Sequence, residues 1–362
     1  MELTEIIVQR IKSKGAISFC DFMEMALYYP GLGYYTSEKE KFGKKGDYYT
    51  SPGLSSLYGK MIGKQLEEMW RNMEEGSFTI VEYGAGAGEL ALDILNYLEN
   101  NPAFFQKIKY YIIEKSATLK NQQQQLLKTK VNWIQDIGEL NGFTGCVLSN
   151  EVLDNFSVNA VVMKEELMEV FVAYEDGFTE VLHPASGELK NYLAEQKIML
   201  PKDYRTEINL GAIEWIQSIA DNLKRGYVIT IDYGYLCNEY YANNRNLGTL
   251  ACYHQHTVTD QLYANIGRQD ITAHVNFSAL HVWGKKYGLD YTGFCNQNYF
   301  LRSLGLANYL RQMETDNLYS RETLFQVNKL LMDMGNKFKV LIQQKSVPDK
   351  ALTGMQFAQR VI

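Results

Sequence analysis

The chain lacks long runs of basic residues and long runs of apolar residues. Its 362 residues hold 36 Lys and Arg against 42 Asp and Glu, a formal net charge of −6. Without a basic run, the sequence offers no bulk electrostatic attraction for nucleic acid or for an anionic membrane. Without an apolar run of membrane-spanning length, it predicts no inserted helix. We therefore expect a small-molecule or protein substrate, and neither nucleic acid nor membrane as a partner.

Cysteine is sparse and unpaired in its spacing. The five cysteines are scattered, and no CxxC pair suggests a zinc knuckle or a redox dithiol, so we expect reduced thiols and no metal. The N-terminal stretch is an amphipathic pattern with acidic residues, unlike a secretion signal or an acid-poor transit peptide. These features predict a cytoplasmic protein. They do not determine whether the chain forms a homodimer.

From Phe78 onward, short apolar runs alternate with helical patterns. Five runs in βαβ order predict parallel strands, and two later runs, YTGF and FKVLIQQ, predict a closing pair. The expected fold is therefore α/β, a Rossmann-like, seven-stranded mixed sheet. A helix over INLGAIEWIQSIADNLK would end at Gly226 as its C′ residue. The five parallel-strand candidates are FTIVEY, IKYYIIE, VNWIQ, CVLSN and YVITIDY.

Two regions fall outside this pattern. Residues 1–77 are rich in Gly and Tyr, with a helix pattern only near each end, Thr4 to Ile11 and Leu57 to Met73. Long segments of this kind are usually functional or disordered, and the dense tyrosines argue against disorder. We expect an N-terminal segment 1–77 and an α/β domain 78–362. An insertion at about 156–225 holds a predicted hairpin over 161–182.

A glycine-rich turn, EYGAGAG, follows the first parallel strand at Glu82 to Gly88. Glycines at 84, 86 and 88 let the backbone turn sharply and let a ligand approach it. A P-loop is excluded because no Gly-Lys-Ser/Thr follows. A dehydrogenase fingerprint needs a small residue where this chain has Glu89, whose charge would repel a pyrophosphate. The pattern favours a ligand without phosphates and is typical of methyltransferases that use S-adenosylmethionine; a turn that binds nothing is the alternative.

Two acidic residues follow the next strands. Glu114 ends the second strand beside the glycine turn, where a carboxylate can accept both hydroxyls of a ribose. NAD enzymes use the same device, but their sheets lack the antiparallel last strand. Asp136 follows the third strand, where it could bind an adenine amino group; an N-cap role is equally open.

The fourth strand ends in SNEVLDNF. Asn150, Glu151 and Asp154 lie just beyond its carboxyl end, where ligands bind in open α/β sheets. Two carboxylates there could hold a guanidinium by bidentate hydrogen bonds and direct its nitrogen at a methyl group. The alternative is an N-cap followed by a first-turn acid.

With these motifs in place, the chain resembles the MidA family, bacterial relatives of the mitochondrial complex I assembly-factor arginine methyltransferase. The similarity runs through nearly the whole sequence. Matching motifs are ISF at 17–19, MALYYP at 25–30, GYY at 33–35, GDYYTSP at 46–52, NE at 150–151, IDYG at 231–234, GTL at 248–250, CY at 252–253 with His256, and DITAH at 270–274.

The resemblance implies a class I methyltransferase with S-adenosylmethionine over the glycine turn, covered by the tyrosine-rich segment as a lid. It implies that Thr50 and Ser51 reach the methionine end of the cofactor, oriented by Asp47 or Tyr48. It also makes His274 and His256 substrate-pocket candidates. The chain departs from the family at Gly53, where Glu is usual, and at Asn276, where an acid is common.

Two functions remain open at this point. The first is a protein methyltransferase acting on arginine, with Glu151, Asp154, Asn150 and His274 as catalytic candidates. For that function we expect Glu82, the three glycines, Glu114, Asp136, Tyr48, Thr50 and Ser51 to bind the cofactor. The second is a non-catalytic assembly or interaction protein that retains the cofactor pocket.

Overall fold

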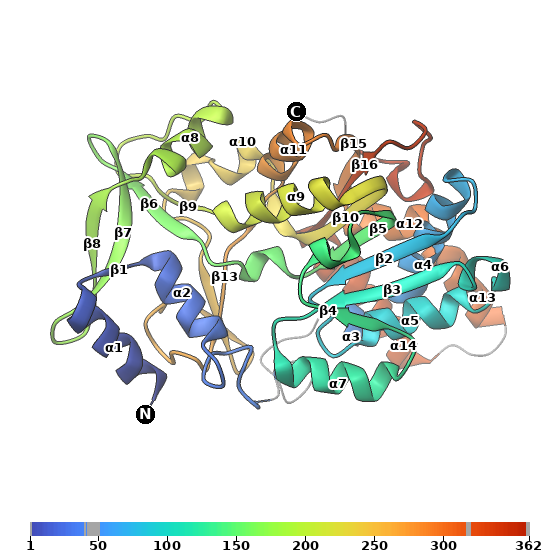
Figure 1. Cartoon of the computed structure of the whole chain (residues 1–362), viewed down its shortest axis with the longest axis horizontal. Coiled ribbons are helices and arrows are strands. Elements are labelled where there is room, and N and C mark those ends of the chain that lie inside the picture. Colours follow the sequence, from blue (N-terminus) through green and yellow to red (C-terminus); the bar gives the residue numbers. More distant parts are fainter. Residues whose placement is uncertain (1, 40, 42–50, 316–319, 360–362) are drawn as a thin grey trace. The chain divides into compact units, whose positions relative to one another are not determined.

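The computed structural model describes residues 2–39, 41, 51–315 and 320–359 (Figure 1). Two compact units make up the chain. The Rossmann unit comprises 49–152, 216–234 and 283–362, and the insert unit comprises 1–48, 153–215 and 235–282. These limits differ from the boundary expected at residue 77, and the functional division into a lid and a methyltransferase domain stays a prediction.

The Rossmann unit contains the seven predicted strands in one mixed sheet, which confirms the expected fold class; a short eighth strand, β14 Val275–Asn276, also pairs with β10. Strands β4, β3, β2, β5 and β10 are parallel. Strand β16 is antiparallel and lies between β10 and β15, so the edge on that side is β15. In order across the sheet the strands are β4 Asn132–Ile134, β3 Ile108–Ile113, β2 Phe78–Tyr83, β5 Phe143–Asn150, β10 Leu223–Tyr235, β16 Phe338–Lys345 and β15 Asp290–Asn296.

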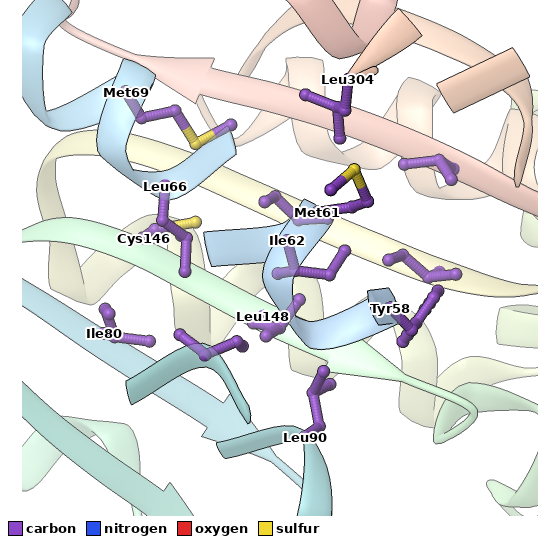
Figure 2. Close-up of a cluster of buried hydrophobic side chains, with 14 of the residues drawn as sticks. Tyr58, Met61, Ile62, Leu66, Met69, Ile80, Leu90, Cys146, Leu148 and Leu304 are labelled. Carbon is purple, nitrogen blue, oxygen red and sulfur yellow. The ribbon is translucent and has the colours of Figure 1, made fainter. Parts of the chain in front are cut away.

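Helix α4, Ser56–Asn72, forms much of the core of this unit. Its apolar side chains recur at helical spacing and lie fully buried against strands β2 and β5 (Figure 2). Burial of each such side chain typically contributes about 1.5–3 kcal/mol. The residues in this contact include Met61, Ile62, Leu66 and Met69 of the helix and Ile80, Cys146 and Leu148 of the strands.

Other helices of the Rossmann unit flank the sheet or follow its edge. They are α3 Ser51–Leu54, α5 Glu89–Leu98, α6 Pro102–Phe105, α7 Ala117–Leu127, η1 Ile137–Leu140, α12 Gln297–Ser303, α13 Leu306–Thr315, α14 Arg321–Asn328, η4 Lys329–Met334, α15 Gly335–Lys337 and η5 Thr353–Met355. Within the described part of the chain, no helix is both long and apolar enough to cross a membrane.

The predicted end of helix α9 is wrong. The helix spans Leu210–Asn222 and β10 begins at Leu223, so Gly226 lies inside a strand and is not a C′ residue. Gly226 has φ +146° and pairs with Gly145, which has φ +153°. A Cβ on Gly226 would lie 1.8 Å from the Gly145 carbonyl oxygen, so the glycine permits close approach of two backbones.

Gly145→Ala should strongly destabilise the fold. Its Cβ would lie 1.9 Å from the carbonyl oxygen of Thr79 on the neighbouring strand. Overpacking and backbone strain together should reduce the free energy of unfolding by about 3 kcal/mol or more. Urea denaturation measures this change. Gly76→Ala is the control, because a Cβ there meets nothing within 4 Å; equal stability of the two variants would contradict the prediction.

The insert unit holds two antiparallel sheets. The predicted hairpin is extended to three strands, β6, β7 and β8. The larger sheet contains β1 Ile17–Ser18, β7 Leu167–Tyr174, β6 Asn159–Met163, β9 Arg205–Ile208 and β8 Phe178–Pro184, and the smaller contains β12 Thr257–Thr259, β11 Ala251–His254 and β13 Asp270–Thr272. Its helices include α1 Leu3–Lys14, α2 Phe19–Tyr28, η2 Leu153–Asn155, α8 Gly187–Glu195, α10 Cys237–Tyr240 and η3 Asn243–Arg245, while α11 Phe277–Lys286 begins here after β14 Val275–Asn276.

Helix α2 corrects the expectation that helix occurs only near the ends of residues 1–77. Ser18 caps the helix by accepting a hydrogen bond from the Asp21 amide at 3.0 Å. Phe19, Phe22 and Met23 are fully buried on its apolar face. The N-cap Ser18 can be identified in the sequence, but the high Gly and Tyr content of residues 1–77 favoured an irregular segment over a helix.

Candidate functional site

Polar groups line one edge of the central sheet. Strands β3, β2, β5 and β10 are parallel, so their carboxyl ends meet at the same edge, where ligands bind in open α/β sheets. Strand β15 runs in the same direction, because both it and β10 are antiparallel to β16. The residues at or just after these ends are Glu114, Gly84 to Gly88, Asn150, Glu151 and Gln297, and Asp232 lies near the end of β10, which continues to Tyr235.

The glycine turn has the conformation that its sequence predicts. Gly84, Gly86 and Gly88 have φ of +61°, +54° and +90°, the left-handed region that favours glycine. A Cβ on Gly84 would lie 3.0 Å from a methyl group of Val152. The turn leads directly into α5 at Glu89. It is therefore a cradle in which a ligand can approach the main chain.

Glu82 lies in the interior at the end of β2. Its side chain is 2% exposed, and the Tyr110 hydroxyl donates to its Oε2 at 2.8 Å. Burial, with a smaller contribution from Glu114, raises the pKa of Glu82 to about 7. Glu82 is therefore a buried, hydrogen-bonded residue just before the glycine turn. Its role in cofactor binding stays a prediction.

Glu114 carries a carboxylate held on both oxygens. The Ser116 amide donates to Oε1 at 2.9 Å, and Gln123 Nε2 donates to Oε2 at 3.0 Å. Burial raises the pKa of Glu114, while these hydrogen bonds act in the opposite direction. The carboxylate is thus oriented by its own unit at the carboxyl end of β3.

Asp136 takes the alternative role that the sequence left open. It is the N-cap of η1, accepting from the Gly138 amide at 2.7 Å, and Glu139 completes a capping box. Contact with adenine stays a prediction. Of the lid residues, Asp47, Tyr48 and Thr50 lie outside the described residues, whereas Ser51 is buried at the start of α3.

Glu151 occupies a strained position after β5. Its φ is +57°, uncommon for a residue with a side chain and frequent at functional sites. The Ser51 amide donates to its Oε1 at 2.9 Å, and Asn150 Nδ2 donates to the same oxygen at 3.2 Å. The Glu151 amide in turn donates to the Ile231 carbonyl at 2.9 Å. Backbone and side chain are therefore both fixed.

Three further polar residues, Tyr58, Gln297 and Asp232, belong to this cluster, and the first two were not predicted from the sequence as site residues. The Tyr58 hydroxyl donates to Asn150 Oδ1 at 2.5 Å, and Gln297 Oε1 lies 3.2 Å from that hydroxyl. Asp232, fully buried, accepts from the Val152 amide at 3.1 Å. Burial, then the nearby Glu151, raise the pKa of Tyr58 well above its ordinary value. Tyr58 therefore stays neutral and acts as a donor.

Asp154 and His274 belong to the insert unit, unlike Asn150 and Glu151. Asp154 is buried in η2, and its carbonyl accepts from the Ala273 amide at 2.9 Å. The His274 ring packs against Tyr235 with centroids 5.0 Å apart. Burial, then the charge of Arg245, lower the pKa of His274 to about 4, so its imidazole is neutral near pH 7. That these residues share one site with Glu151 stays a prediction.

The hydrogen-bond partners of Asn276 explain why an amide fits this position, where the family that the chain resembles commonly has an acid. Its Nδ2 lies within hydrogen-bonding distance of Gln196 Oε1, at 3.0 Å, and of the Tyr192 and Tyr241 hydroxyls. Its Oδ1 accepts from the Ala279 amide at 3.1 Å. Such a set of partners suits an amide, which both donates and accepts.

Asp270 should make the insert unit less stable as pH rises. Burial, then Asp154, raise its pKa from 3.8 to about 8, although Tyr35 and Asn155 donate to its oxygens. Because the folded pKa is the higher, stability from this group is complete below about pH 4 and is lost as pH rises through 8. Asp270→Asn should flatten this part of the profile, measured by urea denaturation from pH 5 to 9. An unchanged slope would contradict the assignment.

Known proteins are similar to the chain over most of its length. A family model described as S-adenosyl-L-methionine-dependent methyltransferase matches residues 61–295. The mitochondrial protein arginine methyltransferase NDUFAF7 homolog of Caenorhabditis elegans is 27% identical, over 93% of this chain and 85% of that protein. The mitochondrial protein arginine methyltransferase NDUFAF7 of Homo sapiens is 25% identical, over 92% of this chain and 81% of that protein.

A solved structure is also similar to the chain over nearly the whole length of both. It is a methyl transferase-like protein from Burkholderia thailandensis bound to S-adenosyl-homocysteine, 31% identical, with a TM-score of 0.90 over 99% of this chain and 95% of that chain. The mitochondrial names of the curated relatives contradict the expected cytoplasmic location. That expectation rested partly on reduced thiols, which indicate a reducing compartment without saying which one.

Proposed function

Because the chain belongs to the MidA family of class I methyltransferases that depend on S-adenosylmethionine, we propose that it methylates an arginine of a protein substrate. The names of the relatives support arginine as the target. The observation that carries the proposal is the Glu151 carboxylate, fixed by two donors at the ligand-binding edge of the sheet. A non-catalytic protein that only binds the cofactor has no evident need for a carboxylate held under strain.

The Rossmann unit fits this cofactor. The left-handed glycines form a cradle without side chains, and Glu114 ends the next strand with its carboxylate already oriented. We propose that the main chain of the glycine turn contacts the cofactor and that Glu114 accepts hydrogen bonds from the ribose hydroxyls. When bound, the cofactor supplies a methyl group on a positively charged sulfur. The residues of this chain then hold, orient and desolvate the nucleophile.

An arginine side chain needs a carboxylate at the site. Its pKa is above about 12, so it arrives as a cation with its nitrogen electrons delocalised. A carboxylate can hold the guanidinium by paired hydrogen bonds, which draw its positive charge toward the nitrogens in contact with the carboxylate and leave electron density on the nitrogen that faces the methyl group. We assign this role to Glu151, with Asp154 as its partner and Asn150 as the residue that orients it. Asp232 and His274 are the next candidates.

The lid is part of the proposal. We place the segment from Tyr34 to Ser55 over the bound cofactor, with Tyr48, Thr50 and Ser51 at its methionine end. The support comes from the family motif GDYYTSP and from the contact of Ser51 with Glu151. Because Gly53 stands in place of the usual family acid, position 53 offers no carboxylate for the cofactor amine or a cationic substrate, and we assign none to it.

Methyl-labelled S-adenosylmethionine tests the proposal. The protein is incubated with labelled cofactor and protein extract from cells that lack its gene, and the digest is analysed for methylarginine. Label in methylarginine supports the proposal. Tight binding of S-adenosylhomocysteine by calorimetry, with no label transferred to protein, would favour the assembly protein instead.

A further inference from the structure

Helix α7 contains four consecutive glutamines, of which one is buried. Gln122, Gln124 and Gln125 are exposed, whereas Gln123 is 0% exposed. A buried amide is costly unless both its oxygen and its nitrogen are hydrogen-bonded. The position of Gln123 therefore requires an explanation that its neighbours do not.

Gln123 joins three elements at the cofactor edge of the sheet. Its Nε2 donates to the carbonyl of Gly86 in the glycine turn at 2.8 Å and to Glu114 Oε2 at 3.0 Å. Its Oε1 accepts from the indole Nε1 of Trp133 on β4 at 2.9 Å. One side chain thus links the turn after β2, the carboxylate after β3 and an indole on β4.

This set of partners selects an amide. Two of them are acceptors and one is a donor, so the residue needs two N–H groups and one acceptor oxygen. Glutamate would offer no donor and would place a second negative charge beside Glu114. Methionine would fill similar space and leave all three partners without this contact.

We propose that Gln123 is a positioning residue that holds the Glu114 carboxylate and the Gly86 carbonyl in the arrangement that receives the cofactor ribose. It acts through Glu114, whose other oxygen is held by the Ser116 amide at 2.9 Å. A carboxylate oriented before binding loses less freedom when the ligand arrives, so affinity rises without a new ligand contact. The inference rests on the proposed assignment of Glu114 to the ribose.

Calorimetry on the full chain with S-adenosylhomocysteine tests this role. Gln123→Met should raise the Kd about tenfold or more, because a charged acceptor loses a donor. Gln123→Glu should raise it further through repulsion of Glu114. Gln124→Met, on the exposed face of the same helix, should bind as the wild type does. Circular dichroism and the urea midpoint establish that each variant is folded.

The 2′-deoxyribose analogue of S-adenosylhomocysteine separates positioning from general support. If Gln123 acts through the Glu114 carboxylate on the ribose, Gln123→Met should weaken binding of the natural ligand much more than binding of the analogue. The double variant with Glu114→Ala should bind no more weakly than Glu114→Ala alone, since both changes remove one interaction. An equal loss of affinity for both ligands in Gln123→Met would overturn the positioning role. Wild-type affinity of this variant for the natural ligand would also overturn it.

The result for Glu114 keeps the two assignments distinguishable. If Glu114→Ala weakens binding while Gln123→Met does not, the inference about Gln123 is wrong and the ribose assignment stands. If Glu114→Ala itself leaves the Kd unchanged, the ribose assignment is wrong, and the inference that depends on it falls with it.

Discussion

Glu151→Gln should lower the rate of methyl transfer by about 30-fold to several thousandfold while leaving cofactor affinity within about threefold of the wild type. Truncating one partner of a hydrogen-bonded charge pair costs about 2–5 kcal/mol. The change preserves the shape of the side chain, its carbonyl can still accept from Ser51 and Asn150, and it removes the charge. Single-turnover transfer at saturating cofactor measures the rate, and calorimetry measures the affinity.

Glu75→Gln is the matched control, because Glu75 is an exposed carboxylate of the same unit. It should transfer methyl groups at the wild-type rate. Wild-type transfer by Glu151→Gln would show that this carboxylate is structural. Parallel loss of transfer and cofactor binding would assign Glu151 to the cofactor, and the substrate carboxylate would then be sought at Asp232.

Glu114→Ala should weaken S-adenosylhomocysteine binding by about 100-fold or more. The variant removes hydrogen bonds from two ribose hydroxyls to a charged acceptor, each worth about 1.5–3 kcal/mol. It also removes the carboxylate that Ser116 and Gln123 hold in place. Calorimetric titration measures the affinity. Unchanged affinity, or tight binding of NAD by the wild type, would contradict the assignment of the ribose to Glu114.

The central sheet was predictable because its strands are buried in a parallel arrangement. Such strands appear in the sequence as short apolar runs, and the helices between them enforce the parallel connections. The order of the last two strands was not predictable from these runs, since β16 enters the sheet between β10 and β15. The sequence also did not predict that α9 passes directly into β10. Gly226 allows close approach to Gly145 on β5, a residue far away in the sequence.

The cofactor half of the site was easier to predict than its support. Gly84 to Gly88 and Glu114 follow strands directly, so their places could be predicted from local patterns. Tyr58 could not, because its partners Asn150 and Gln297 lie far away in the sequence. Gln123 could not, because a glutamine run gives no sign of which member is buried. Asp136 shows the opposite difficulty, since an N-cap role was an equally open explanation from its sequence, and the structure adds a capping box with Glu139.

The most direct test of arginine methylation through Glu151 is quantitative mass spectrometry of methylarginine peptides in cells that lack the gene. Complementation compares wild type with Glu151→Gln expressed at equal levels. The account predicts that at least one methylarginine peptide disappears on deletion, returns with the wild type and stays absent with Glu151→Gln. A methylarginine profile unaffected by deletion, or one restored in full by Glu151→Gln, would contradict it.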